Sequence, residues 1–149
     1  MLRHAFFTLR TLLIATLLMA PLAVQAGSVY EPKRGTAERK QLMNAARPFA
    51  EENLGSPVQF VVETLRVDGR VGYAFLKAQR PGGKAIDMRK TPYSRKFGYD
   101  PNIYPGMAVT FSKKGGRWVF DGGEISPFEP LTGPKICAKY ATVLSPGLC

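Results

Sequence analysis

The sequence predicts an α+β domain in which an N-terminal kinked helix packs on an antiparallel sheet of about four strands. Three observations support this prediction. Apolar residues recur every three or four positions between residues 37 and 54, which is the period of a helix. Two pairs of β-rich runs follow, and a glycine-containing turn joins each pair. Two cysteines near the end of the sequence predict a short C-terminal segment that is closed by a disulfide.

Residues 1–26 are predicted to be a cleavable secretory signal peptide. The first ten residues contain two arginines and no acidic residue, residues 11–20 are largely apolar, and Pro21 interrupts that run. Valine and alanine stand at the third and first positions before the expected cleavage after Ala26. A retained membrane helix is the alternative, but it needs about 20 apolar residues. We therefore expect a mature chain that begins at Gly27 and is periplasmic or secreted.

The mature chain is predicted to be basic. Beyond Ala26 it has 19 basic and 11 acidic residues, which gives a net charge of +8. Such a charge favours anionic partners through long-range attraction. For an exported protein we expect an anionic envelope component, such as lipopolysaccharide phosphates, phospholipid headgroups or acidic peptidoglycan groups, or an acidic protein. Nucleic acid is not the expected partner, and a peripheral contact with a membrane surface is compatible with the charge.

The mature chain has the length of one domain. Residues 27–35 carry no hydrophobic period and are predicted to form a flexible leader. Residues 36–149 are predicted to form a single α+β domain, because they are enough for one hydrophobic core and too few for two.

The predicted helix covers residues 37–54. Thr36 can cap it, because a threonine hydroxyl accepts a hydrogen bond from a free amide of the first turn. Gly55 is the expected end. Pro48 lies inside the pattern and lacks an N–H donor, so we expect either a kink or two short helices with Pro48 in the first turn of the second.

The first predicted hairpin joins residues 58–67 to residues 71–78 through Asp68-Gly69. The alternating apolar residues of its first strand change phase near Glu63. Because a change of phase turns side chains to the other face of a sheet, we expect a β-bulge or burial on both faces there.

The second predicted hairpin joins residues 107–112 to residues 117–120 through the lysine- and glycine-rich turn 113–116. Its apolar residues alternate, and we expect Trp118 and Phe120 to belong to the core that covers the helix. The following segment Asp121-Gly-Gly-Glu124 is interpreted as a glycine turn that carries two surface acids, because glycines at a strand end favour a turn.

The order of these elements, with the stretches ENLGSPVQFVVETLRVDGRVGYAFLKA and GRWVF, resembles small exported bacterial proteins of the cystatin-like or NTF2-like architecture. The resemblance covers about 80 residues and depends on element order, as a fold-level argument. It implies a scaffold that hosts binding modules, inhibitors and some enzymes, with the concave face or edge loops of the sheet as the place of binding.

The cysteines Cys137 and Cys149 are predicted to form a disulfide, because an isolated pair in an oxidising compartment is most simply bonded. A redox-active pair is the alternative, but thiol-exchange motifs hold their cysteines closer in sequence.

Catalysis is not expected. The only histidine, His4, lies in the predicted signal peptide, so the mature chain has no imidazole base for a Ser-His or Cys-His arrangement. The sequence has two glycine-rich stretches, at residues 81–84 and 114–117. Neither has the Lys-Ser or Lys-Thr pair of a phosphate-binding loop. We therefore predict a protein that is not an enzyme and that needs no cofactor and no metal.

Residues 80–106 are predicted to be a long loop that joins the two hairpins. Loops of this length are usually functional or disordered. Cations and aromatic rings alternate inside it, a mixture that can hold a phosphate, a glycan or a nucleic acid. The predicted binding residues for the anionic partner are Arg89, Lys90, Tyr93, Arg95, Lys96, Phe97 and Tyr99. The alternative is a solvated loop whose rings hold it against the domain.

Two hypotheses for the function follow. The first is a non-catalytic binding or inhibitor-like module whose basic surface binds the anionic partner, with an accessory or immunity role in a secretion or conjugation system as one form. The second is a small NTF2-like ligand carrier or enzyme with an apolar pocket between helix and sheet, lined by the face of Tyr73, Phe75 and Trp118. If the protein is a binding module for an anionic partner, its binding must weaken as the salt concentration rises. If it is a ligand carrier or enzyme, the fold must contain an apolar cavity.

Overall fold

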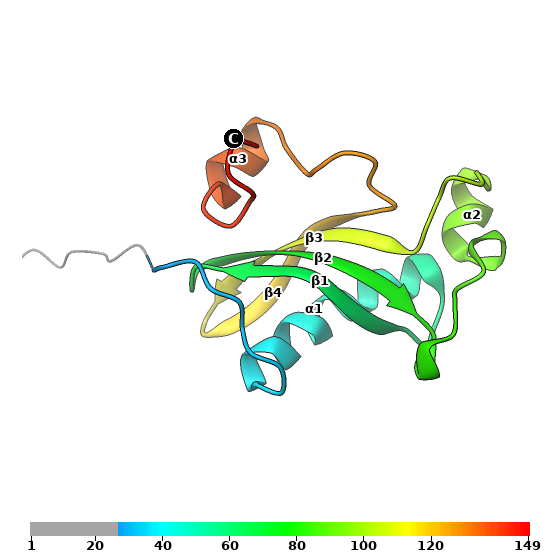
Figure 1. Ribbon diagram of the computed structural model, residues 1–149, viewed down its shortest axis with the longest axis horizontal. Coiled ribbons are helices and arrows are strands. Elements are labelled where there is room, and N and C mark those ends of the chain that lie inside the picture. The colour runs from blue at the N-terminus through cyan, green and yellow to red at the C-terminus, as the bar shows by residue number, and fades with distance from the viewer. Residues whose placement is uncertain (1–26) are drawn as a thin grey trace, which may run out of the picture.

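The computed structural model describes residues 27–149, so the predicted signal peptide lies outside the described residues. The predicted α+β fold is confirmed (Figure 1). The helices and strands are, in order, α1 (Ala37–Leu54), β1 (Gln59–Val67), β2 (Val71–Gln79), the 3-10 turns η1 (Pro81–Gly83) and η2 (Met88–Lys90), α2 (Pro92–Phe97), β3 (Gly106–Lys114), β4 (Arg117–Ile125) and α3 (Pro134–Tyr140).

The four strands form one antiparallel sheet in the order β1-β2-β3-β4. In Figure 1, α1 lies along one face of this sheet, and the C-terminal segment with α3 lies over the other. The short helix α2 stands at one end of the sheet, near the end of α1. Both faces of the sheet are therefore covered, and the outer sides of β1 and β4 are its edges.

Helix α1 begins and ends where the sequence predicts. The hydroxyl of Thr36 accepts a hydrogen bond from the amide of Arg39, and the amide of Gly55 donates to the carbonyl of Glu51. The chain forms one helix with Pro48 inside it rather than two short helices.

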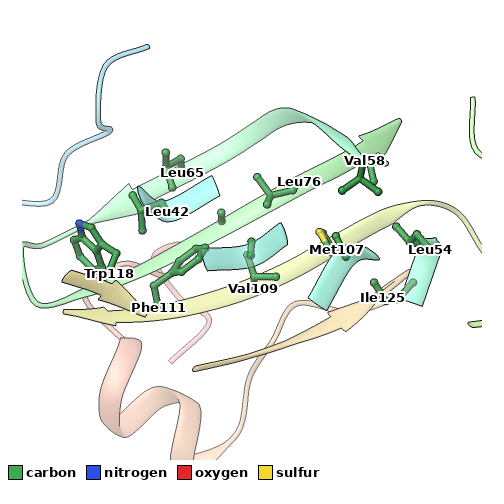
Figure 2. Close-up of a cluster of buried hydrophobic side chains, with 14 of the residues drawn as sticks. Leu42, Leu54, Val58, Leu65, Leu76, Met107, Val109, Phe111, Trp118 and Ile125 are labelled. Atoms are coloured by element: carbon green, nitrogen blue, oxygen red, sulfur yellow. The ribbon is translucent and has the colours of Figure 1, made fainter. Parts of the chain in front are cut away.

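The main core lies between α1 and the sheet (Figure 2). Successive turns of α1 bury Leu42, Ala46, Ala50 and Leu54 against apolar side chains of all four strands. Phe111 on β3 is fully buried there. The rings of Phe49 and Phe120 stack at 4.9 Å, and Trp118 belongs to the same cluster, as predicted.

The predicted bulge in β1 is confirmed. The register between β1 and β2 shifts between Val62 and Thr64, so that Glu63 is the extra residue. The shift places Leu65 and Val67 in the core, although they are out of phase with the residues before the bulge.

The C-terminal segment packs a second, smaller cluster on the far face of the sheet. Tyr140, Val143 and Leu144 are buried there against residues that include Val71 and Tyr73 of β2. The guanidinium of Arg66 donates a hydrogen bond to the carbonyl of Leu144 (3.0 Å). The predicted disulfide between Cys137 and Cys149 is present and closes this segment.

The leader 27–35, expected to be flexible, makes specific contacts with the domain. Tyr30 pairs with Val67 at the end of β1 through two backbone hydrogen bonds of 2.9 Å. The side chain of Arg39 donates to the carboxylate of Glu31 (2.7 Å) and to the carbonyl of Pro32 (2.8 Å). These contacts place the leader against α1 and the end of β1.

Asp121 corrects another expectation, because it lies inside β4 rather than in a glycine turn. It is the extra residue of a bulge where the pairing of β3 with β4 shifts. Its carboxylate, 13% exposed, accepts hydrogen bonds from the hydroxyl of Tyr140 (2.6 Å) and the ammonium of Lys139 (2.9 Å). Burial alone would raise the pKa of Asp121, but these donors and the charge of Lys139 lower it to about 2.

We expect Asp121→Asn to lower the free energy of unfolding at neutral pH by about 1 kcal/mol. The pKa shift alone would give a larger value, but solvent weakens the ion pair because Lys139 is exposed. Because the pKa of Asp121 is lower in the folded state than its ordinary 3.8, this stabilisation is complete above pH 4 and is lost as the pH falls through about 2. Denaturant unfolding of both proteins at pH 7, 4 and 2 measures it. Glu124→Gln on the same strand is the control, and a stability difference that stays constant down to pH 2 would contradict the prediction.

Candidate binding surfaces

The predicted long loop is an ordered segment in the structure. Between β2 and β3 the chain forms η1, η2 and α2. Ile86 and Met88 are buried in the main core, and Tyr93 and Ile103 pack against it. These apolar contacts hold the segment on the end of the sheet.

Side-chain caps fix the local shape of the segment. The carboxylate of Asp87 accepts a hydrogen bond from the amide of Arg89 at the start of η2. The buried hydroxyl of Thr91 donates to the carbonyl of Met88 (2.8 Å) and accepts from the amide of Ser94 (3.2 Å), so it caps α2. α2 therefore begins at a defined place, and its direction is set by buried groups.

Arg80 joins this segment to the end of α1. Its guanidinium donates hydrogen bonds to the carbonyl oxygens of Leu54 (2.8 Å), Pro57 (3.0 Å) and Gly55. The last carbonyls of a helix have no partner within the helix and carry partial negative charge, so a cation is favourable there. The sequence pattern did not indicate this contact, because it placed Arg80 only at the start of the predicted loop.

The four predicted cations of the segment are exposed. Arg89 pairs with Asp87 (2.8 Å), and Lys90 lies 4.0 Å from the same carboxylate. The hydrogen bonds and charge of Arg89 hold the pKa of Asp87 below its usual value. Arg95 donates to the carbonyl of Lys90 (2.8 Å), and neither Arg95 nor Lys96 has a carboxylate within ion-pair distance among residues 27–149. Residues 84–100 contain five cations and two carboxylates, so they carry a net charge of +3.

The three predicted rings do not share one environment. Tyr93 is half-buried and packs against the main core. Phe97 and Tyr99 are 62% and 51% exposed, which is unusual for large rings. The ring of Phe97 lies 4.9 Å from Tyr93 and 5.0 Å from the ammonium of Lys96.

Six of the seven predicted residues are thus exposed within residues 89–99, and the seventh, Tyr93, is half-buried against the main core. We call the exposed set the α2 surface; it consists of Arg89, Lys90, Arg95, Lys96, Phe97 and Tyr99. In Figure 1 this part of the chain projects from the end of the sheet. Its rings and cations are exposed to solvent.

Sequence reasoning missed a groove between α1 and β1, with a volume of ≈ 480 Å³. The α1–β1 groove is lined by residues that include Arg34, Lys40, Asn44, Arg47, Phe60 and Val61. Lys40, Met43, Asn44 and Arg47 recur at helical spacing, so the sequence did contain a signal for this second face of α1.

A second cleft, of ≈ 290 Å³, lies on the face of the sheet away from α1. It is lined by Tyr73 and Phe75 of β2 together with Tyr104 and Phe128. Burial raises the pKa of Tyr73. Trp118 lies on the other face, where its indole N–H donates to the carboxylate of Glu38 on α1 (3.0 Å). The expectation that Tyr73, Phe75 and Trp118 line one cavity is therefore wrong, because Trp118 does not share their face.

Comparison with models of protein families, with curated proteins and with solved structures found no match. The cystatin-like or NTF2-like resemblance therefore stays a prediction. Within residues 27–149, no helix combines the length and the apolar character needed to cross a membrane. In the same residues, no group of three or more acidic, cysteine or histidine side chains is placed to hold a metal ion.

Proposed function

We propose that this protein is an exported, non-catalytic binding module whose α2 surface contacts anionic, phosphate-bearing groups of the cell envelope, such as the headgroups of acidic phospholipids. The observation that supports this most strongly is the exposure of Phe97 and Tyr99 beside four exposed cations on one projecting segment. The disulfide between Cys137 and Cys149 is compatible with an oxidising compartment.

The rings of the segment differ in what covers them. Rings that only hold a loop in place pack against the domain, as the half-buried Tyr93 does. Phe97 and Tyr99 instead leave apolar area in water, which costs free energy unless a partner covers it. At a lipid surface such rings enter the headgroup region, and each neighbouring cation is attracted to anionic lipid by about 1 kcal/mol.

An acidic protein is the other anionic partner that the charge allows, and an accessory or immunity factor would use the same surface in that way. The lipid proposal is preferred because two exposed rings stand beside four exposed cations, and a headgroup region takes up both apolar rings and positive charge.

The experiment is co-sedimentation with vesicles. We expect the purified protein, with its disulfide intact, to bind vesicles of phosphatidylglycerol mixed with phosphatidylcholine at low salt. Binding should weaken at least tenfold when the salt rises from 50 to about 500 mM, because the Debye length falls several-fold. Vesicles of phosphatidylcholine alone are the control. Equal binding to both vesicle types, or no binding at low salt, would contradict the proposal.

The aromatic cleft favours a second function, a carrier of a small apolar ligand. Its volume lies at the lower end of the range for ligand sites, and four rings line it. Binding there would depend on apolar contact and would change little with salt, so a salt titration distinguishes this function from the first.

A further inference from the structure

The free edge of β1 lies beside the α1–β1 groove. β1 is the first strand of the sheet, so only its inner side pairs with β2. On its outer side, the pairing found among residues 27–149 is that of Val67 with Tyr30. The backbone groups that point outward from residues 59–65 therefore have no strand partner, which makes this part of β1 able to pair with another chain.

The leader pairs with one residue of this edge, so the outer side of β1 accepts backbone hydrogen bonds from another segment. Tyr30 donates to and accepts from Val67 through two hydrogen bonds of 2.9 Å in antiparallel pairing. Pro32 follows, which has no N–H to donate, and the chain then turns into α1. The leader thus occupies one end of the edge and leaves the remainder open.

The groove beside the open edge is cationic. Its lining includes Arg34, Arg39, Lys40 and Arg47, and no acidic residue lines it in the part of the chain that the structure describes. Arg39 is paired with Glu31 at 2.7 Å. The other three cations have no carboxylate within ion-pair distance among residues 27–149. An anionic occupant would therefore be attracted to the groove.

The apolar side chains of β1 beside the groove alternate between the two faces of the sheet, as the side chains of an added strand would. Phe60 and Val62 face the α1 side, where they pack against the core, and the guanidinium of Arg47 lies 5.3 Å from the ring of Phe60. Val61 points the other way and is 42% exposed. A strand added at this edge would place alternate side chains near the cations and the others beside Val61.

We propose that the α1–β1 groove binds an extended acidic segment of a partner protein, which adds to the sheet as a fifth strand beside β1. The recognised pattern alternates acidic residues, which face the cations of α1, with apolar residues, which cover Val61. Pairing between two copies of this chain is disfavoured, because it would bring two sets of groove cations together. This site is separate from the α2 surface and does not depend on the function proposed for it.

The test uses a capped eight-residue peptide that alternates valine and glutamate, titrated into the purified protein and followed by NMR. We expect the amide signals of residues 59–65 to shift and their hydrogen exchange to slow. The signals of the α2 surface should stay unchanged. The same peptide with lysine in place of glutamate should not bind.

Two N-methylated forms of the peptide test strand addition directly. One carries the methyl groups on its valine amides and the other on its glutamate amides, so each removes the donors along one edge without changing the charge. We expect at least one form to lose affinity tenfold or more, because it cannot donate to β1. If both forms bind as tightly as the parent peptide, the contact is electrostatic only and strand addition is refuted.

Charge variants of the protein test the groove. Arg34→Glu with Lys40→Glu should weaken binding of the peptide at least tenfold, because both cations are exposed and lie beside the edge. Lys96→Glu with Lys135→Glu is the matched control, since it changes the charge equally at exposed positions outside the groove and away from β1. Equal weakening in both double variants would overturn the proposal. Retention of peptide binding by a protein whose α2 surface is altered would separate this site from the lipid contact.

Discussion

Replacing Arg89, Lys90, Arg95 and Lys96 together by glutamate is expected to abolish binding to phosphatidylglycerol vesicles. The four reversals change the local charge by eight units, and all four side chains are exposed. Attraction becomes repulsion within a Debye length of about 8 Å at physiological salt. We expect a loss of at least a hundredfold in the partition coefficient, measured by co-sedimentation at constant salt.

The matched control reverses four exposed cations elsewhere, Lys33, Lys77, Arg117 and Lys135. It gives the same net charge and should retain most of the binding, because its reversals are spread over other surfaces. Stability should change little in either variant, since an exposed substitution away from caps and core usually costs less than about 0.5 kcal/mol. A folded quadruple variant of the α2 surface that binds as the original does would eliminate this surface as the site.

The three rings of the segment are expected to contribute differently to stability, because Tyr93 packs on the core whereas Phe97 and Tyr99 are exposed. Tyr93→Ala should lower the free energy of unfolding by about 2 kcal/mol, about half the cost of removing a fully buried ring. It removes contacts with the main core and with Phe97. Phe97→Ala and Tyr99→Ala should leave stability within about 0.5 kcal/mol, because both rings are exposed. Denaturant unfolding of the three variants measures these differences.

Vesicle binding should show the opposite order. Phe97→Ala and Tyr99→Ala should each weaken binding several-fold, because each removes apolar area that would enter the headgroup region. Phe97→Leu is the control that keeps apolar area without the ring. If Phe97→Ala destabilised the fold as strongly as Tyr93→Ala and left binding unchanged, the segment would be only a packed cover.

The sequence was sufficient for features that short-range physics decides. The change of phase near Glu63 predicted a bulge, because a residue can reverse its face in a sheet only if an extra residue is inserted. Thr36 and Gly55 predicted the limits of α1, because caps act within one turn. The isolated pair Cys137 and Cys149 predicted the disulfide. Each of these depends on residues that are close in sequence or on a period of two or three to four.

The sequence also identified residues of one candidate site, but it did not predict how they are arranged in space. The interleaved cations and rings of residues 89–99 identified the segment, whereas the division between Tyr93 and the exposed rings came from packing. The sequence pattern does not distinguish a buried ring from an exposed one among Tyr93, Phe97 and Tyr99. Only the position of α2 at the end of the sheet decides which ring has the core beside it.

Tertiary structure alone decided the contacts between segments far apart in sequence. The sequence predicted Asp121 to be a surface acid, whereas in the structure its carboxylate accepts hydrogen bonds from Tyr140 and Lys139 of α3. The sequence placed Arg80 in a loop, whereas in the structure its guanidinium donates to a carbonyl at the end of α1. The open edge of β1 likewise follows from strand order, which no local pattern encodes. The sequence by itself determined α1 with its caps, the two hairpins and the net charge, because these depend on neighbours along the chain. The environment of each charged group, and the grooves between elements, were decided only when distant segments packed together.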